Sequence, residues 1–330
     1  MNVQITIIGL GRIGTSIGLA LADETEQIFR VGYDESLEVA RKSEKLGAVD
    51  KTHINLHSAV EKADIVVLTL PPNELRKTLE TITPTLKDEV VVIDTSPGCV
   101  DTLAWAKGLI PGGRYFFKIF PTLNPDYFSD ETNSVDDAHK DLFANSLMAI
   151  IPQDGTKSEA IQLVTDLTTL LGASPFFSDP YEMDGLMAAS QFLPQVISAA
   201  LINATTEQPG WKEAGKVAGY AYHWASKPIQ EMDEIKAISE NAFANKENSV
   251  RVINNAIQSL ITIRECIESQ DTEELEKILE QANENRTQWQ RQRGSSNWEK
   301  VIEKPPMPTS SEMFKHWFGF TLRKTKDKEK

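Results

Sequence analysis

The sequence contains very little cysteine. Only Cys99 and Cys266 occur among its 330 residues, and they form no C-x-x-C pair. A disulfide scaffold and a structural zinc site both need more cysteines than this, so neither is expected. His53 and His57 have a spacing that can bind zinc on a helix, but no third ligand stands near them in the sequence, so we predict no metal site.

Basic charge is scarce as well. The chain has 34 Lys and Arg residues against 48 Asp and Glu residues, and its formal net charge is −14. This balance argues against nucleic acid as a partner, because phosphate binding needs a basic face. No uninterrupted run of about 18 apolar residues occurs, so we expect no membrane span. The first residues lack the basic and apolar regions of a signal peptide, which predicts a cytoplasmic protein.

What the sequence does contain is a change of pattern near residue 178. Its length predicts about two domains. Before that point short apolar runs alternate with helical patterns, which is typical of a mostly parallel sheet covered on both faces. We therefore predict an α/β dinucleotide-binding (Rossmann) domain over 1–178 and an all-α helical domain over 179–303. Residues 304–330 are predicted to be a tail, with aromatic and then basic residues.

The same patterns predict the individual elements. Strands are predicted over 3–8, 28–33, 65–70, 89–94, 115–119, 147–151 and 174–177. Helices of the first domain are predicted over 12–22, 37–46, 71–82 and 158–171, and residues 126–141 are predicted to be an irregular polar segment. Helices of the second domain are predicted over 180–204, 210–223, 228–244, 246–269 and 272–293. Their apolar stripes fit either the core of a bundle or a dimer interface.

A glycine-rich turn directly follows the first predicted strand. It reads G-x-G-x-x-G and opens a predicted helix, which is the context that makes this motif specific. The first glycine allows the tight turn, the second a close approach of pyrophosphate, and the third close helix–strand packing. Free N–H groups at the helix start bind phosphate. The predicted cofactor-binding residues here are Gly9, Leu10, Gly11, Arg12, Ile13 and Gly14. For the Arg12 side chain, a phosphate contact and a solvated position both remain open.

An aspartate follows the second predicted strand. Asp34 lies 20 residues after Gly14, where a ribose-binding carboxylate is expected. Its oxygens suit the ribose hydroxyls and would repel a 2′-phosphate, so NAD is predicted as the cofactor and NADP is not excluded. Leu70, Pro71 and Thr95 follow two further strands and are predicted to line the same crevice.

Five segments between residue 1 and about residue 293 carry a resemblance to a known family. They are Gly9–Ser16, Gly32–Asp34, Leu46–Asp50, Ala63–Leu68 and the Asp179-Pro180-x-x-x-Asp184 segment with the Ser190–Gln195 stretch that follows it. Together they resemble the prephenate/arogenate dehydrogenase family. The resemblance implies a dinucleotide-binding domain followed by a helical dimerisation domain, and hence a homodimer. It also implies NAD(P)-dependent oxidation of a cyclohexadienol with loss of CO₂, a step of tyrosine biosynthesis.

The substrate side departs from the family pattern. The family has a histidine before a proline after its sixth strand, and that histidine binds the substrate hydroxyl; this chain has Phe120 there. The family's arginine for a substrate carboxylate falls near residues 222–226, which contain no arginine. Its serine and lysine after the fifth strand fall on Ser96 or Pro97 and on Cys99. The chain thus resembles a divergent member of this family that lacks the histidine and the arginine that bind the substrate.

These departures have a chemical consequence. An alcohol gives up hydride readily only when its proton leaves too, which needs a base with a pKa near 7. Phe120 cannot act in this way, so the predicted catalytic residues are Ser96, Lys118 and His223, with Arg114 as a further cation.

Three functions therefore remain open. The first is a dehydrogenase of this family acting on prephenate or arogenate. The second is a dehydrogenase on the same scaffold that acts on another small substrate, and the third is a non-catalytic NAD-binding protein. The fold alone does not decide among them, because function depends on the site.

Overall fold

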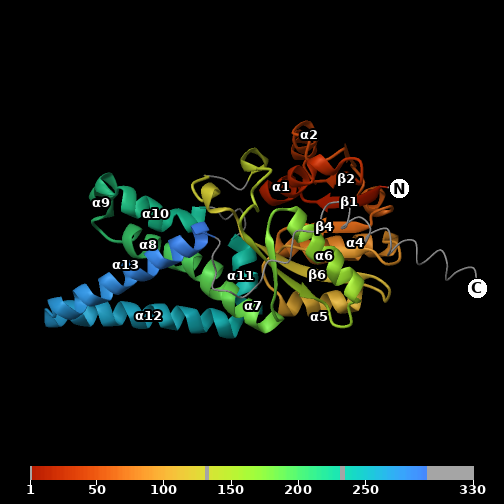
Figure 1. Ribbon diagram of the computed structural model, residues 1–330. Helices are drawn as coiled ribbons and strands as arrows, with labels where there is room; N and C mark the ends of the chain where they lie inside the picture. Colours follow the sequence, from red (N-terminus) through yellow and green to blue (C-terminus); the bar gives the residue numbers. More distant parts are fainter. Residues whose placement is uncertain (1, 131–133, 231–234, 296–330) are drawn as a thin grey trace, which may run out of the picture. The chain divides into compact units, whose positions relative to one another are not determined.

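The chain forms two compact units (Figure 1). A computed structural model describes residues 2–130, 134–230 and 235–295. One unit comprises Met1–Asp179, and the other comprises Pro180–Ser295. The predicted tail over 304–330 lies outside the described residues.

The first unit is built on a sheet of eight strands in the order β3-β2-β1-β4-β5-β6-β7-β8. All neighbouring strands are parallel except β6 and β7, which are antiparallel. The predicted α/β fold with a mostly parallel sheet is confirmed. The strands are β1 (Val3–Ile8), β2 (Ile28–Tyr33), β3 (Lys51–Thr52), β4 (Ile65–Leu68), β5 (Val91–Asp94), β6 (Tyr115–Pro121), β7 (Leu147–Pro152) and β8 (Ser174–Phe177).

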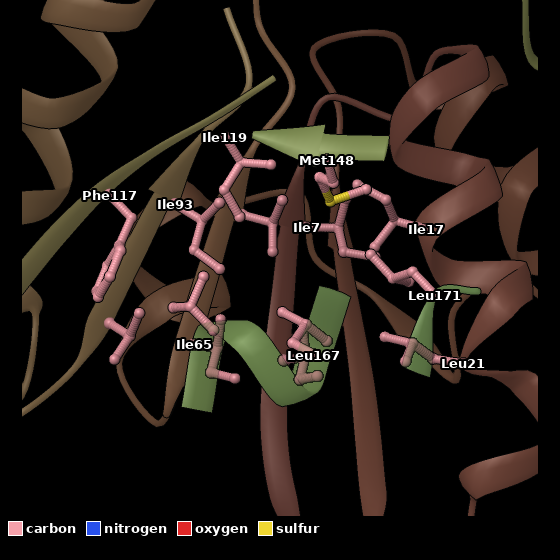
Figure 2. Close-up of a cluster of buried hydrophobic side chains, with 14 of the residues drawn as sticks. Ile7, Ile17, Leu21, Ile65, Ile93, Phe117, Ile119, Met148, Leu167 and Leu171 are labelled. Atoms are coloured by element: carbon pink, nitrogen blue, oxygen red, sulfur yellow. The ribbon is translucent and has the colours of Figure 1, made fainter. Parts of the chain in front are cut away.

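Helices cover both faces of this sheet. They are α1 (Arg12–Ala20), α2 (Leu37–Lys45), α3 (Leu56–Val60), α4 (Pro72–Ile82), α5 (Val100–Leu109) and α6 (Ser158–Leu170), with 3₁₀ turns at Ala22–Glu24, Thr83–Thr85, Pro125–Tyr127 and Val135–Asp137. One apolar cluster joins α1, α2 and α6 to the sheet, and a second joins α3, α4 and α5 to it. Figure 2 shows the first cluster, where Ile17 of α1, Leu21 directly after that helix and Leu167 of α6 meet the strands.

Three elements of this unit were not predicted: β3, α3 and α5. The strand has two residues and α3 has five, so neither completes a repeat of its hydrophobic pattern. The α5 helix begins only after Pro97 and Gly98, and it buries only Thr102 and Ala106, so its sequence carries no clear apolar stripe. The carboxyl ends of the parallel strands and the start of α1 lie at one edge of the sheet, where ligands bind in such folds.

The second unit is helical throughout its described residues, as predicted. Its elements are α7 (Pro180–Met187), the π-helical turn η5 (Ala188–Phe192), α8 (Leu193–Thr206), α9 (Trp211–Val217), α10 (Tyr220–Gln230), α11 (Ile235–Ala244), α12 (Lys246–Ser269) and α13 (Thr272–Ser295). The π turn ends two residues before Pro194, which has no N–H for a regular helical bond.

Two predicted helix boundaries in this unit are wrong. The predicted helix over 210–223 is divided at Gly219 into α9 and α10. The predicted boundary at Pro228 does not exist, because α10 continues through this proline. A proline normally leaves helical bonds unmade, but here the Ser198 hydroxyl donates to the Ser226 carbonyl and accepts from the Ile229 N–H. The buried serine thus gives hydrogen-bond partners to two backbone groups that flank the proline.

One helical span passes a length and composition test for crossing a membrane. It is Pro180–Thr206, which has 27 residues and a window of mean hydropathy 1.4. Only 11% of that window is buried within the chain. An apolar helix that another protein chain covers passes the same test, so these features alone do not place the helix in a membrane.

Candidate active site

The glycine turn joins β1 to α1 in a conformation that side chains would block. Gly9 has φ +90°, and a Cβ built on it would lie 2.5 Å from the Thr69 carbonyl oxygen. A Cβ on Gly14 would lie 1.9 Å from the Gly9 carbonyl oxygen. Gly11 is the extended residue before α1, and no side chain caps the helix there. The first N–H groups of α1 therefore remain available to a ligand anion.

Asp34 lies at the end of β2, beside this turn. Its carboxylate accepts hydrogen bonds from the Leu10 N–H at 2.7 Å and from the Ser36 N–H at 2.8 Å. These bonds fix the carboxylate next to the glycine turn and leave each oxygen with further lone pairs. Hydroxyl donors of a ribose are the groups that such a carboxylate accepts.

The ends of β4 and β5 form the other side of this edge. The Thr69 hydroxyl donates to the Gly9 carbonyl at 2.5 Å, and the Thr95 hydroxyl donates to the Leu68 carbonyl at 3.1 Å. Leu70, Pro71 and Thr95 are half-buried here. The structure thus brings these three predicted residues to the strand ends beside the turn.

A dinucleotide fits this edge on three observations. Side chains at Gly9 and Gly14 would clash with the backbone, the α1 amino end is uncapped, and Asp34 is held by two N–H donors. The turn would hold the diphosphate and Asp34 the adenosine ribose, and a bound nicotinamide would supply a hydride acceptor.

The Arg12 side chain is buried and ion-paired, so the solvated alternative is wrong. Its Nη2 donates to Asp130 Oδ2 at 2.6 Å and to the Tyr127 carbonyl at 3.3 Å. Its Nε is buried and has no hydrogen-bond acceptor among the described residues. Only 6% of the side chain is exposed.

The Asp130 carboxylate also binds a histidine that sequence reasoning missed. His139 Nε2 lies 3.1 Å from Asp130 Oδ2, and the imidazole stacks on the Tyr127 ring at 3.9 Å between centroids. The Tyr127 hydroxyl donates to Asp141 Oδ1, and this bond raises the pKa of Tyr127 to about 12. His139 lies within the predicted irregular segment, and its spacing from Arg12 in sequence gave no signal of this contact.

Ser96 and Lys118, two predicted catalytic residues, meet where the end of β5 lies beside the middle of β6. The Lys118 ammonium donates to Asp94 Oδ2 at 2.5 Å, to the Ser96 carbonyl at 2.5 Å and to Ser96 Oγ at 3.1 Å. Asp94 also accepts from the Ser96 N–H and hydroxyl. The Lys118 and Asp94 side chains are fully buried, so the Lys118 ammonium contacts Asp94 and Ser96 and does not reach solvent.

Phe120 covers this buried cluster. Its ring centroid lies 5.1 Å from the Lys118 ammonium, and the residue is buried. The ring therefore stabilises the lysine cation and offers no proton acceptor at this place.

The other predicted groups lie elsewhere. His223 is an exposed residue of α10, in the second unit, and its ring meets Trp224 edge to face. Arg114 precedes β6 and donates to the Leu86 carbonyl, so it lies at the opposite edge of the sheet from Ser96. Among the residues that the structure describes, no group of three metal-binding side chains is placed to hold an ion.

Comparison with known proteins decides the family. A model described as prephenate dehydrogenase, nucleotide-binding domain, matches residues 17–175, and one described as prephenate dehydrogenase, dimerization domain, matches residues 179–281. The chain belongs to the prephenate dehydrogenase family. The predicted class, an NAD(P)-dependent oxidoreductase of this family, is confirmed. The first match begins after the glycine turn, so the argument for that turn rests on its own geometry.

Individual relatives are distant. The chain is 26% identical to the cyclohexadienyl dehydrogenase of Zymomonas mobilis over 60% of its own length and 66% of that protein. It is 23% identical to the prephenate dehydrogenase of Bacillus subtilis over 87% of its own length and 76% of that protein.

Solved structures of the family share the fold. Arogenate dehydrogenase of Synechocystis matches with a TM-score of 0.68 at 23% identity, over 87% of this chain and 99% of that one. Prephenate dehydrogenase of A. aeolicus, solved with hydroxyphenyl propionate and NAD+, matches with a TM-score of 0.76 at 19% identity, over 87% of this chain and 98% of that one.

Proposed function

We propose that this protein is an NAD-dependent dehydrogenase that oxidises a small-molecule alcohol, with prephenate or arogenate as the leading substrates. The observation that carries the proposal is the glycine turn with Asp34 bonded to the Leu10 N–H beside it. In this proposal the N–H groups at the start of α1 bind the diphosphate, Asp34 binds the adenosine ribose, and Leu70, Pro71 and Thr95 line the nicotinamide side. The A. aeolicus relative solved with NAD+ supports this cofactor.

For the chemical step we propose Ser96 as the group that contacts the substrate or the nicotinamide ribose. Lys118 would hold the Ser96 carbonyl and hydroxyl in place, and His223 is the proposed partner for a substrate anion. Because Phe120 offers no base, we expect turnover of prephenate to be slow. The phenylalanine at position 120, where the family has a histidine, affects the removal of the hydroxyl proton.

The domain roles are proposed on the same basis. Residues 1–178 would bind the nucleotide, and 179–303 would form a homodimer, as the dimerization-domain match supports. A cytoplasmic location is proposed as well, in keeping with the two free cysteines, Cys99 and Cys266.

One titration and one assay test this function. NADH is expected to bind more tightly than NADPH, and Asp34→Arg is expected to reverse that preference, because the arginine would bind a 2′-phosphate. Turnover is then measured with prephenate, arogenate and a panel of small hydroxy acids. Equal affinity for NADH and NADPH would contradict the proposal that Asp34 binds the adenosine ribose.

The same panel addresses a non-catalytic role, which the buried Phe120 ring favours. Tight NADH binding without turnover of any alcohol in the panel would support a non-catalytic dinucleotide-binding protein. Rapid release of CO₂ from prephenate would contradict it and would require a base other than residue 120.

A further inference from the structure

The residues after β6 pack onto the start of α1 and are fixed there by several polar contacts. We call residues 122–130 and 134–142 the edge segment. The His139 N–H donates to Ser16 Oγ of α1 at 3.0 Å, and Lys140 forms an ion pair with Asp23 at 2.5 Å. A further ion pair joins Asp136 to Lys42 of α2. These contacts place the edge segment beside the glycine turn, within the first unit.

The most buried of these contacts is the ion pair between Arg12 and Asp130. Arg12 belongs to the glycine motif, and its neighbours in that motif are the residues whose N–H groups face a bound anion. Its side chain points to the edge segment, since Nη2 donates to Asp130 Oδ2 and to the Tyr127 carbonyl. Its Nε has no accessible surface through which a ligand oxygen would reach it.

We propose that Arg12 and Asp130 are positioning residues of the cofactor site. Their ion pair holds the edge segment against the glycine turn, and the Arg12 side chain contacts this segment instead of a cofactor phosphate. This inference rests on the proposed function, because it concerns the same dinucleotide site. The Arg12 backbone N–H remains one of the groups that bind the diphosphate.

The charges support this assignment. The carboxylate neutralises the guanidinium, so the pair adds no net charge at the diphosphate, and both partners keep a strong hydrogen bond away from water. Asp130 also binds His139, whose ring stacks on Tyr127. The loss of Asp130 would therefore release Arg12, which ties the edge segment to α1, and His139, which lies in the same segment as Asp130.

The test measures NADH affinity by calorimetry in four full-length variants. Arg12→Met and Asp130→Ala are each expected to weaken NADH binding about tenfold, and the double variant is expected to be no weaker than either single one, as for residues that act together. The slope of the dissociation constant against salt concentration is expected to stay at its wild-type value, because no phosphate contact is lost. Asp136→Ala is the matched control, since it removes an exposed ion pair of the same segment, and wild-type affinity is expected.

A different pattern overturns the inference. If Arg12 binds phosphate in competition with Asp130, then Asp130→Ala tightens NADH binding and Arg12→Met lowers the salt dependence. Wild-type affinity in Asp130→Ala also contradicts the role proposed here while leaving the dehydrogenase proposal intact. Absence of NADH binding by the wild-type protein would contradict both.

Discussion

The two units of the chain differ in where they keep their apolar side chains. The first unit buries two large clusters, one on each face of its sheet. In the second unit few residues are buried within the chain, and large side chains of its long helices are exposed, among them Leu260 at 60% and Ile267 at 59%. Contiguous exposed apolar surface marks a site that another molecule covers. The first unit therefore buries most of its apolar side chains within itself, whereas the second leaves large ones exposed, which the homodimer proposed above would cover.

The ion pairs of the two units differ as well. In the first unit, several pairs include a buried cation: Lys118 with Asp94, Arg30 with Asp50 and Arg12 with Asp130. In the second unit, ion pairs such as that of Arg264 with Glu268 join exposed residues one helical turn apart. Exposed pairs of this kind add little stability. The first unit depends on its own interior contacts, and this dependence is what mutation tests most directly.

The largest effect is expected at Lys118. Lys118→Met leaves the fully buried Asp94 carboxylate without its cation, and breaking a buried pair in this way costs about 3–5 kcal/mol of unfolding free energy. Urea denaturation measures the change. Lys118→Met with Asp94→Asn is expected to recover part of the loss, because no charge then remains buried.

Lys87→Met is the matched control for this experiment. It also removes a lysine bound to an aspartate, Asp64, but both side chains are partly exposed, so a change of at most about 1 kcal/mol is expected. Equal losses in the two lysine variants would contradict the view that the interior pairs hold the first unit together.

A second large effect is expected at Gly14, and it concerns binding more than stability. The methyl group of Gly14→Ala would lie 1.9 Å from the Gly9 carbonyl oxygen, so the turn must shift. A loss of NADH affinity of about tenfold or more is expected, equivalent to about 1.4 kcal/mol. Gly108→Ala in α5 is the control, because nothing lies within 4 Å of the added Cβ. Unchanged affinity in Gly14→Ala would refute the place of the dinucleotide at this turn.

A third prediction tests the second unit. Leu260 is exposed on α12, and Leu260→Asp is expected to lower the stability of a dimer by placing a charge in the interface, while an isolated chain would tolerate it. Light scattering after size-exclusion chromatography measures the shift from dimer to monomer. Ser259→Asp, at the neighbouring exposed position, is the control. If the wild-type protein is a monomer, or Leu260→Asp remains as dimeric as Ser259→Asp, then α12 does not form the interface.

Local pattern explains which features the sequence predicted. Helix α12 and strand β1 have the predicted bounds, 246–269 and 3–8, because each carries a complete hydrophobic repeat. The glycine turn was predicted because its six residues are contiguous. The continuation of α10 through Pro228 was not, since it depends on Ser198, which is 30 residues away in sequence.

The candidate site divides in the same way. The pair of Arg12 with Asp130 joins residues 118 apart, and His139 contacts Asp130 within a segment that has no periodic pattern. Such contacts depend on how the strands order themselves in the sheet, and no spacing rule in the sequence contains that information. The roles of Ser96, Lys118 and His223 in catalysis stay predictions.

The smallest expected effect concerns the edge segment. It tests whether a hydrogen bond inside this segment helps to hold it in the first unit. The hydrogen bond to Asp141 raises the pKa of Tyr127 from 10 to about 12. Because the folded pKa is the higher one, this bond stabilises the fold at neutral pH, and the stabilisation is lost as the pH rises from 10 through 12. Absorbance titration of phenolate is expected to show a late component that Tyr127→Phe removes. At neutral pH the same substitution is expected to lower the unfolding free energy by about 1 kcal/mol, the value of one hydrogen bond. If Tyr127 instead titrates near 10, the Tyr127–Asp141 bond does not persist in solution, and this contact does not help to hold the edge segment in the first unit.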